Sequence, residues 1–218
     1  MIQLSLFPTN VLHIQKITIK EARTLLSKYH YLKSCSNNAS CFGAFENNIL
    51  VGVVAFQIPC SEKIRENVYG AEYKQYIIEL GRLVLHPTCK TLASQIVSKC
   101  IEALQAYRIQ QGKTKYKAII SFADTKHGHH GGVYQAMSWL YCGTTRKYTT
   151  YYKDKNNCIR HPRQQGKNIT VKQALEKGWT LEKSNVCKHR YIKLLGTKKQ
   201  KKQLRKILKY SCLKYPCS

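Results

Sequence analysis

The chain has 218 residues, enough for one domain with a sizeable core and scarcely enough for two. Hydrophobic residues make up 43% of it, with only 12 Gly and 5 Pro, which excludes fibrous, collagen-like and disordered proteins. The unusual quantity is the charge, because 37 Lys and Arg oppose 11 Asp and Glu for a formal net charge of +26. The 73 residues after Thr145 hold 21 basic and 3 acidic residues, and this asymmetry favours nucleic acid as the partner.

Nothing in the sequence indicates secretion or a membrane partner. The segment from Met1 to Pro8 has no basic n-region and reaches a proline too early for a signal peptide, and no stretch approaches transmembrane length. The basic C-terminal segment has too few apolar residues for a membrane-surface helix. None of the 10 cysteines forms a CxxC pair, so we expect reduced, mostly structural thiols in an intracellular protein.

The first half of the chain combines strand patterns with one strong helix start. Thr18 and Glu21 form a capping-box pattern, and Asn47-Asn48 separates two β-rich segments as in a hairpin. The predicted elements are a strand over 11–17, a helix over 18–29, a hairpin of strands over 41–46 and 49–57, and a buried strand over 76–85.

In the second half, helices follow strands, which predicts parallel crossovers. The predicted elements are helices over 92–110, 133–140, 170–178 and 198–209, and strands over 117–122, 144–152 and 190–195. The order indicates an α/β fold with a mixed sheet flanked by helices. We expect one domain over 1–196 and a basic extension over 197–218 that packs on or beside it.

Asp124 is the first candidate functional residue. The chain has two aspartates, and Asp124 follows the strand predicted over 117–122 and precedes a loop rich in glycine and histidine. Open α/β sheets bind their ligands at such strand ends. The alternative is an aspartate that caps local backbone N–H groups.

The loop 127–132 itself contains three histidines and three glycines before a predicted helix. Glycines and free N–H groups at this place suit the close approach of an anion, and the histidines could bind a metal. A plain turn that needs glycine is the alternative.

Two further positions carry side chains that are unusual for their place. Tyr29-His30-Tyr31 follows the first helix, where it could stack on a base, supply metal ligands or simply close the helix end. Arg82 lies inside the apolar strand over 76–85 beside Glu79, so it either forms a structural ion pair or faces a cleft.

Basic residues alternate with tyrosines in the C-terminal third, a pattern typical of nucleic-acid binding. A solvated charged face is the alternative. The predicted DNA contacts are Arg146, Lys147, Lys188, Arg190, Lys198 and Lys199.

Several segments together carry a family resemblance. They are 78–85, 93–94, 121–125, 128–131, 133–139, 141–143 and 188–191, and the most specific runs from Phe-Ala-Asp-Thr to Tyr-Gln-Ala-x-x-Trp over 122–139. In these segments the chain resembles the Mom family of phage DNA-modification proteins, from about residue 20 to the C-terminus.

This resemblance implies a GNAT-like fold with a mixed, strongly twisted sheet. It implies a transferase that adds a carbamoylmethyl-type group to N6 of adenine in double-stranded DNA, in the cytoplasm of a bacterial host, and so protects phage or prophage DNA from restriction. Base flipping would expose the adenine. The oligomeric state stays open, a homodimer included.

The resemblance also implies roles for individual residues. His30 and Tyr31 match the family's His-Tyr pair, and Asp124 matches its essential aspartate, as a general base or, together with His30 and Tyr31, as a ligand of iron. Three further residues match functional positions of the family, namely Tyr134, Arg82 and Ser94. The resemblance implies that Arg82 and Ser94 bind the cofactor.

The chain departs from ordinary GNAT enzymes in one segment. Those enzymes hold the coenzyme A pyrophosphate with a Q/R-x-x-G-x-G/A loop, whereas residues 86–94 contain no glycine, which puts acetyl-CoA as the donor in doubt. The rival functions are a conventional N-acetyltransferase for a protein or small amine, and a basic DNA-binding protein without enzymatic activity.

Overall fold

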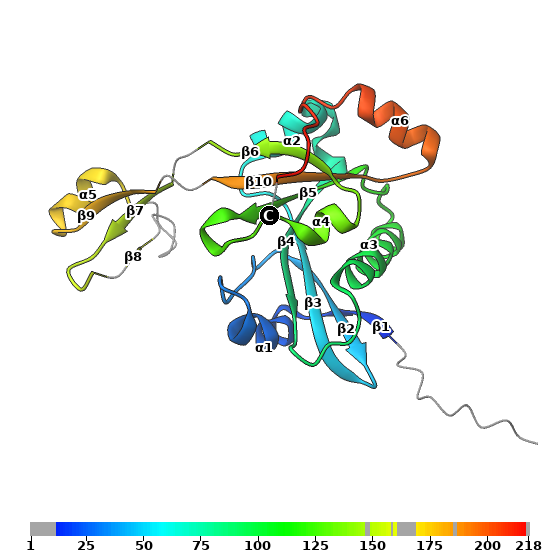
Figure 1. Cartoon of the computed structure of the whole chain (residues 1–218), viewed down its shortest axis with the longest axis horizontal. Coiled ribbons are helices and arrows are strands. Elements are labelled where there is room, and N and C mark those ends of the chain that lie inside the picture. Colours follow the sequence, from blue (N-terminus) through cyan, green and yellow to red (C-terminus); the bar gives the residue numbers. More distant parts are fainter. Residues whose placement is uncertain (1–11, 147–148, 158, 161–168, 185–186, 217–218) are drawn as a thin grey trace, which may run out of the picture.

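The computed structural model describes residues 12–146, 149–157, 159–160, 169–184 and 187–216, which form two sheets (Figure 1). The larger sheet has the order β1-β2-β3-β4-β5-β10-β6, with strands β1 (Leu12–Ile17), β2 (Ser40–Glu46), β3 (Ile49–Gln57), β4 (Ile77–Leu85), β5 (Ala118–Asp124), β10 (Lys188–Leu194) and β6 (Leu140–Thr144). The smaller sheet has the order β8-β7-β9, with strands β8 (Ile159–Arg160), β7 (Thr149–Lys153) and β9 (Thr180–Ser184).

Helices connect and cover these strands. They are α1 (Ile19–Tyr29), α2 (Glu62–Tyr69), α3 (Ala93–Gln110), α4 (Gly132–Ala136), α5 (Val171–Glu176) and α6 (Lys198–Lys206), with the 3-10 helices η1 (Ala71–Tyr76) and η2 (Thr125–His127). Among the described residues, no helix is long and apolar enough to cross a bilayer.

Local sequence signals determine the first four strands and α1. The predicted capping box is confirmed, because the Glu21 carboxylate accepts the Thr18 N–H at 2.7 Å and the Thr18 hydroxyl accepts the Glu21 N–H at 3.2 Å. The hairpin is confirmed too, and Asn47 and Asn48 adopt φ values of 49° and 63°, as its tight turn requires.

The parallel pair β4 and β5 forms a fork. The two strands pair from Ile77 with Ala118 to Leu80 with Ser121 and no further. Beyond that point β4 pairs only with β3, past a register shift beside Gly81, and β5 continues against β10. Two neighbouring strands that stop pairing leave an opening between them, and this opening positions the site described below.

Apolar side chains fill both faces of the large sheet. On one face, α3 and α4 cover a cluster that contains the fully buried Trp139 and Tyr191. On the other face, α1 covers β2 to β4, while α2 and α6 cover β5, β10 and β6. The prediction of a mixed sheet flanked by helices is confirmed.

Three predictions about the elements are wrong. The helix expected over 133–140 ends at Ala136, because Ser138 turns into the left-handed region at φ 55° and Leu140 begins β6. The strand expected over 144–152 is divided, because β6 ends at Thr144 and β7 begins at Thr149, and α2 and η1 occupy parts of 62–76 where the polar composition predicted no element. The connection from β5 through α4 to β6 is not a parallel crossover to the neighbouring strand. β10 lies between β5 and β6 and is antiparallel to both.

The C-terminal extension contacts the large sheet. Leu204 of α6 is buried beside β10, and the Leu213 N–H donates to the Tyr141 carbonyl at 2.9 Å. The Tyr215 hydroxyl donates to the Trp139 carbonyl at 2.9 Å. These contacts connect the basic segment to β6 and the turn that precedes it.

Candidate functional site

A cavity of about 480 Å³ opens at the fork between β4 and β5. Four chain segments line it: the end of α1, β4 at Gly81 and Leu83, the end of β5, and the loop that leads into α4. Four residues singled out in the sequence meet here, namely His30, Tyr31, Asp124 and Tyr134. Residues about 100 positions apart in the chain therefore share one cavity, which we call the fork pocket.

His30 is held as a neutral imidazole. Its Nδ1 accepts the Leu32 N–H at 3.1 Å, which leaves the ring proton on Nε2. Burial lowers the pKa of His30 to about 4, and the charges of Arg82, His129 and His127 act in the same direction. At neutral pH the side chain therefore offers an N–H donor and no positive charge.

This pKa shift predicts how stability depends on pH. Between pH 6.5 and 4 the unfolded chain protonates His30 and the folded chain does not, so the free energy of unfolding falls as the pH falls through this window. In His30→Asn, whose amide oxygen can replace Nδ1 as an acceptor, we expect a smaller loss. Urea unfolding at pH 7 and pH 5 measures the difference. The exposed His13 of β1 supplies the control His13→Asn, in which the loss should equal that of the wild type.

Tyr31 lies among imidazoles. Its ring stacks on His30 with centroids 4.6 Å apart, and its centroid lies 4.0 Å from His127 and 5.7 Å from His129. Its own side chain is only partly covered, with 37% exposed. Through Tyr31, the segment after α1 therefore contacts the loop 127–132, which we call the histidine loop and which also lines the fork pocket.

Asp124 lies at a cavity at the end of a strand and also caps a local backbone N–H group, the two possibilities that its sequence position suggested. It is 9% exposed and lines the fork pocket at the end of β5. Its Oδ1 accepts the Lys126 N–H at 3.1 Å, as a cap of η2, and its Oδ2 lies 3.2 Å from the Lys188 Nζ. The backbone N–H and the lysine thus hold the two carboxylate oxygens in a fixed orientation.

Tyr191 holds the histidine loop in place. The Tyr191 hydroxyl donates to the His130 carbonyl at 2.5 Å, and the Gln135 amide donates to the same oxygen at 3.0 Å. Gly131 has φ 82°, and a Cβ there would overlap the Tyr191 ring. Glycine is therefore required at this position by both backbone conformation and space.

Tyr134 lies at the inner end of the pocket, next to a carboxyl group that sequence reasoning treated only as a partner for Arg82. The Tyr134 hydroxyl is 2.7 Å from the Ser121 hydroxyl, which donates to the Leu80 carbonyl. Burial raises the pKa of Tyr134 to about 12, and the nearby Glu79 contributes to that rise. Glu79 accepts the Gln57 amide at 3.3 Å, and burial raises its pKa. The signal that could have revealed Glu79 in the sequence is a polar side chain within an apolar strand.

Arg82 supports the pocket from outside. Its Nε donates to the Ser34 carbonyl at 2.7 Å and its Nη1 to the Gly81 carbonyl at 2.6 Å. The guanidinium thereby connects β4 to the segment that carries His30 and Tyr31.

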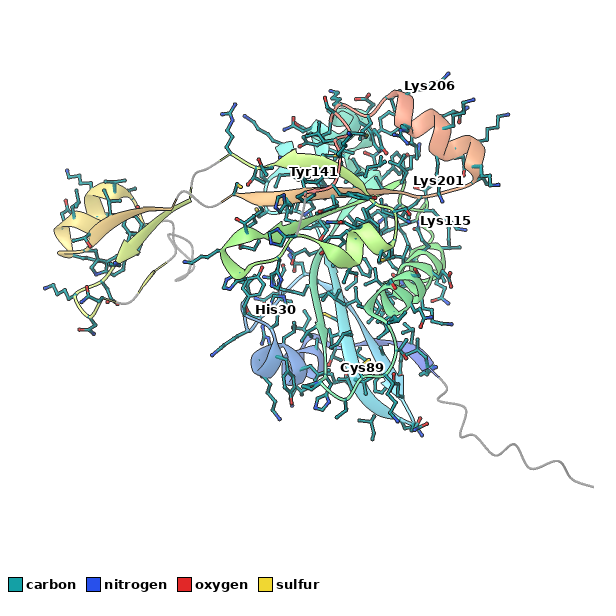
Figure 2. The ribbon with its side chains drawn as sticks, in the orientation of Figure 1. His30, Cys89, Lys115, Tyr141, Lys201 and Lys206 are labelled. Atoms are coloured by element: carbon teal, nitrogen blue, oxygen red, sulfur yellow. The ribbon has the colours of Figure 1, made fainter. Side chains whose placement is uncertain are left out.

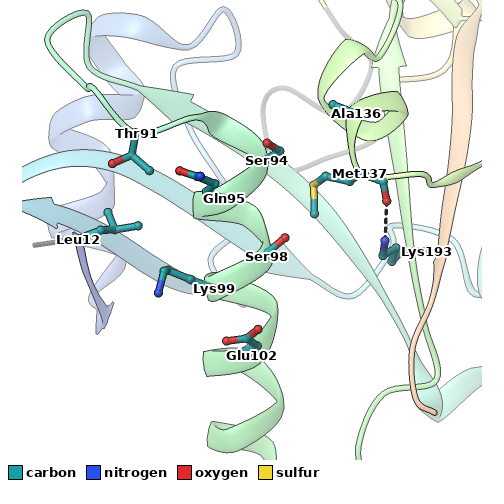
Figure 3. Close-up of a pocket in the computed structure, with 10 residues that line it drawn as sticks. All are labelled: Leu12, Thr91, Ser94, Gln95, Ser98, Lys99, Glu102, Ala136, Met137 and Lys193. Atoms are coloured by element: carbon teal, nitrogen blue, oxygen red, sulfur yellow. Dashed lines mark hydrogen bonds between the residues drawn. The ribbon is translucent and has the colours of Figure 1, made fainter. Parts of the chain in front are cut away.

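Ser94 lies in a different cavity, of about 610 Å³, between α3 and the chain after α4 (Figure 3). Figure 3 shows Ser94 and Ser98 on α3 and Met137 across from them, with the Met137 carbonyl accepting from the Lys193 Nζ at 2.6 Å. The predicted cofactor contact at Ser94 is thus separate from the four residues of the fork pocket.

The loop between β4 and α3 is organised by a carboxylate of the chain itself. Glu46, 6% exposed at the end of β2, accepts the Thr91 N–H at 2.9 Å and the Thr91 hydroxyl at 2.6 Å. It also accepts the Lys90 N–H at 3.2 Å. These N–H groups are therefore engaged within the chain, in the segment where the absence of glycine put the pyrophosphate loop in doubt.

The predicted DNA contacts are divided among several elements. Lys188 pairs with Asp124 at the fork pocket. Arg190 donates to the Cys142 carbonyl at 3.0 Å and lies 4.3 Å over the Tyr210 ring. Arg146, Lys198 and Lys199 are exposed, and Lys147 lies outside the described residues. Figure 2 labels Lys201 and Lys206 on α6 beside the last two.

The three side chains expected to bind iron do not fit a metal in this arrangement. His30 presents Nε2 with its proton rather than a lone pair, and both Asp124 oxygens already have partners. Within the described part of the chain, no three His, Cys, Asp or Glu side chains are grouped to hold a metal ion. We therefore derive no step through iron, and its presence stays a prediction of the family resemblance.

Known proteins match the chain in sequence and in fold. The model of the Mom protein family matches residues 11–217. The chain is 25% identical over 206 residues to the methylcarbamoylase Mom of Escherichia phage Mu, a match that covers 91% of this chain and 81% of that protein. An acetyltransferase structure from Acinetobacter baylyi has a TM-score of 0.50 and 12% identity, covering 88% of this chain and 96% of its own. The ribosomal-protein-S18-alanine N-acetyltransferase of Escherichia coli has a TM-score of 0.49 and 8% identity, covering 86% and 96%. The predicted GNAT-like fold is confirmed.

Proposed function

The chain belongs to the Mom protein family, and from this premise we propose that it is a transferase that adds a carbamoylmethyl-type group to N6 of adenine in double-stranded DNA. The modification would protect phage DNA from restriction in the cytoplasm of the bacterial host. The phage Mu relative is a methylcarbamoylase, which supports a transferase of this kind. The net charge of +26 supports a polyanionic substrate.

The observation that carries the proposal is the fork pocket. A buried carboxyl group, a neutral imidazole and two phenols meet in a cavity large enough for a nucleobase. A base inside a duplex is stacked and paired, so the adenine must turn out of the helix before it can enter. The exposed Tyr31 lies at the pocket and provides an aromatic edge for it.

In the pocket, the residues of the chain would act on the N6 amine. The N6 lone pair is delocalised into the adenine ring, so the amine is a weak nucleophile. As the N6–C bond to the donor forms, the donor's leaving group departs with its bonding electrons and the N6 proton passes to Asp124. The His30 Nε2–H is the donor available to orient a ring nitrogen or the leaving group, because the Tyr134 hydroxyl donates to the Ser121 hydroxyl.

Mass spectrometry of nucleosides tests this proposal. DNA from bacteria that express the chain should contain a new adenine nucleoside, and DNA from bacteria that express Asp124→Asn should not. Unmodified DNA together with an acetylated protein or amine would favour a conventional N-acetyltransferase instead. Unmodified DNA without any acetylated product would favour a DNA-binding protein that is not an enzyme.

A further inference from the structure

A second hollow, outside the fork pocket, gathers positive charge. A groove of about 470 Å³ lies between β10, β6 and α6. Four cationic side chains line it, Lys193 from β10 and Lys201, Lys202 and Arg205 from α6, and Ser138 contributes a hydroxyl. We call it the α6 groove. None of its four cations is among the residues predicted as DNA contacts.

Among the described residues that line the groove, none is acidic, and the sequence has no Asp or Glu after Glu182. Lys193 is half-buried, and its Nζ donates to the Met137 carbonyl at 2.6 Å. Burial lowers the pKa of Lys193, and the charge of Lys201, which lines the same groove, acts in the same direction. A bound anion would reduce the repulsion between these two charges.

The composition of α6 is not explained by helix stability. Its first turn contains Lys198 and Lys199 and no acidic residue, although the positive end of a helix dipole favours acidic side chains there. The helix is held instead by the capping box of Thr197 and Gln200 and by burial of Leu204. The lysines of the first turn, which do not line the groove, therefore oppose the local electrostatics of the helix, so helix stability does not explain the positive charge of this segment.

The fork pocket and the α6 groove lie toward opposite ends of β10. Lys188 of this strand pairs with Asp124 of the pocket, and Lys193 lines the groove. Five residues of extended strand at about 3.3 Å each separate the two by roughly 17 Å. At about 3.4 Å per nucleotide along one strand, this distance corresponds to about five nucleotides of a DNA duplex. One duplex can reach both places.

We propose that the α6 groove binds the backbone phosphates of the DNA duplex whose adenine enters the fork pocket. The assignment rests on the proposed function for the identity of the nucleic acid. The ligand chemistry is a row of phosphates, and Lys201, Lys202 and Arg205 are the residues that contact them.

The salt dependence of duplex binding tests the groove. In K201Q/K202Q/R205Q, loss of three phosphate contacts should lower the slope of log K against log salt by about 2.7 and weaken binding roughly 100-fold at low salt. The matched control K206Q/K209Q/K214Q removes the same charge from the same segment outside the groove, and its slope should equal that of the wild type. Fluorescence anisotropy with a labelled 20-base-pair duplex measures both, and circular dichroism checks folding.

Three results would overturn the groove assignment. The slope could stay unchanged in K201Q/K202Q/R205Q, it could fall equally in the control, or inorganic phosphate or an RNA duplex could displace the labelled DNA better than unlabelled DNA does. These results are independent of nucleoside analysis. A reduced slope without any adenine adduct would contradict the proposed function and leave the groove in place, whereas an adduct with an unchanged slope would do the reverse.

Discussion

Asp124→Asn is expected to lower the rate of adenine modification by about 100- to 10,000-fold, the range associated with removal of a general base. Asparagine can still accept the Lys126 N–H that caps η2, so the end of β5 keeps its shape. It cannot take the N6 proton. Duplex affinity should stay equal or rise, because the substitution removes a negative charge beside Lys188. Timed modification of a duplex, followed by nucleoside mass spectrometry, gives the rate.

Asp154 provides the matched control. It is the only other aspartate of the chain, and its Oδ1 accepts the Asn156 N–H at 2.9 Å in the same kind of local turn. Asp154→Asn should therefore modify DNA at the wild-type rate. Metal analysis of the purified wild type and of Asp124→Asn tests the ligand role that the family resemblance implies, since that role requires iron in the wild type and its loss from the variant. A normal rate in Asp124→Asn would exclude both roles.

Glu46→Ala is expected to lower the free energy of unfolding by about 3 kcal/mol. The substitution removes the buried carboxylate that accepts the Lys90 and Thr91 N–H groups and the Thr91 hydroxyl. For a chain of this length the melting temperature should fall by about 10 °C. Thermal unfolding followed by circular dichroism measures the change.

Glu102→Ala is the control for Glu46. Glu102 is an exposed glutamate of α3 in the cavity that contains Ser94, and its removal should change the unfolding free energy by no more than about 0.5 kcal/mol. Equal melting temperatures for Glu46→Ala and the wild type would mean that the loop before α3 does not depend on this carboxylate.

Strong local signals made most of the fold predictable. The capping box at Thr18, the Asn47-Asn48 turn and the helical spacing over 92–110 each express a short-range preference that tertiary contacts reinforce. The helix predicted over 133–140 failed because its apolar residues belong to two elements. Trp139 is buried by the sheet, and Leu140 pairs with Ile192 of β10, far along the chain.

The candidate site was predictable in part, for the same reason. Asp124 could be recognised from its place after a strand, and the structure puts it in one cavity with His30, Tyr31 and Tyr134. That arrangement depends on where β4 and β5 stop pairing, which no short segment encodes. The Glu46 carboxylate likewise accepts from Thr91, which lies more than 40 positions further along the chain. The α6 groove brings Ser138 together with residues of α6 that lie more than 60 positions away.

A crystal structure of Asp124→Asn with a duplex that contains the target adenine is the most direct measurement of the account. We expect the adenine turned out of the helix and seated in the fork pocket, with N6 within about 2.6–3.2 Å of the side chain at position 124. An adenine that stays stacked in a bound duplex, or that occupies another cavity with N6 remote from this side chain, would contradict the central claim.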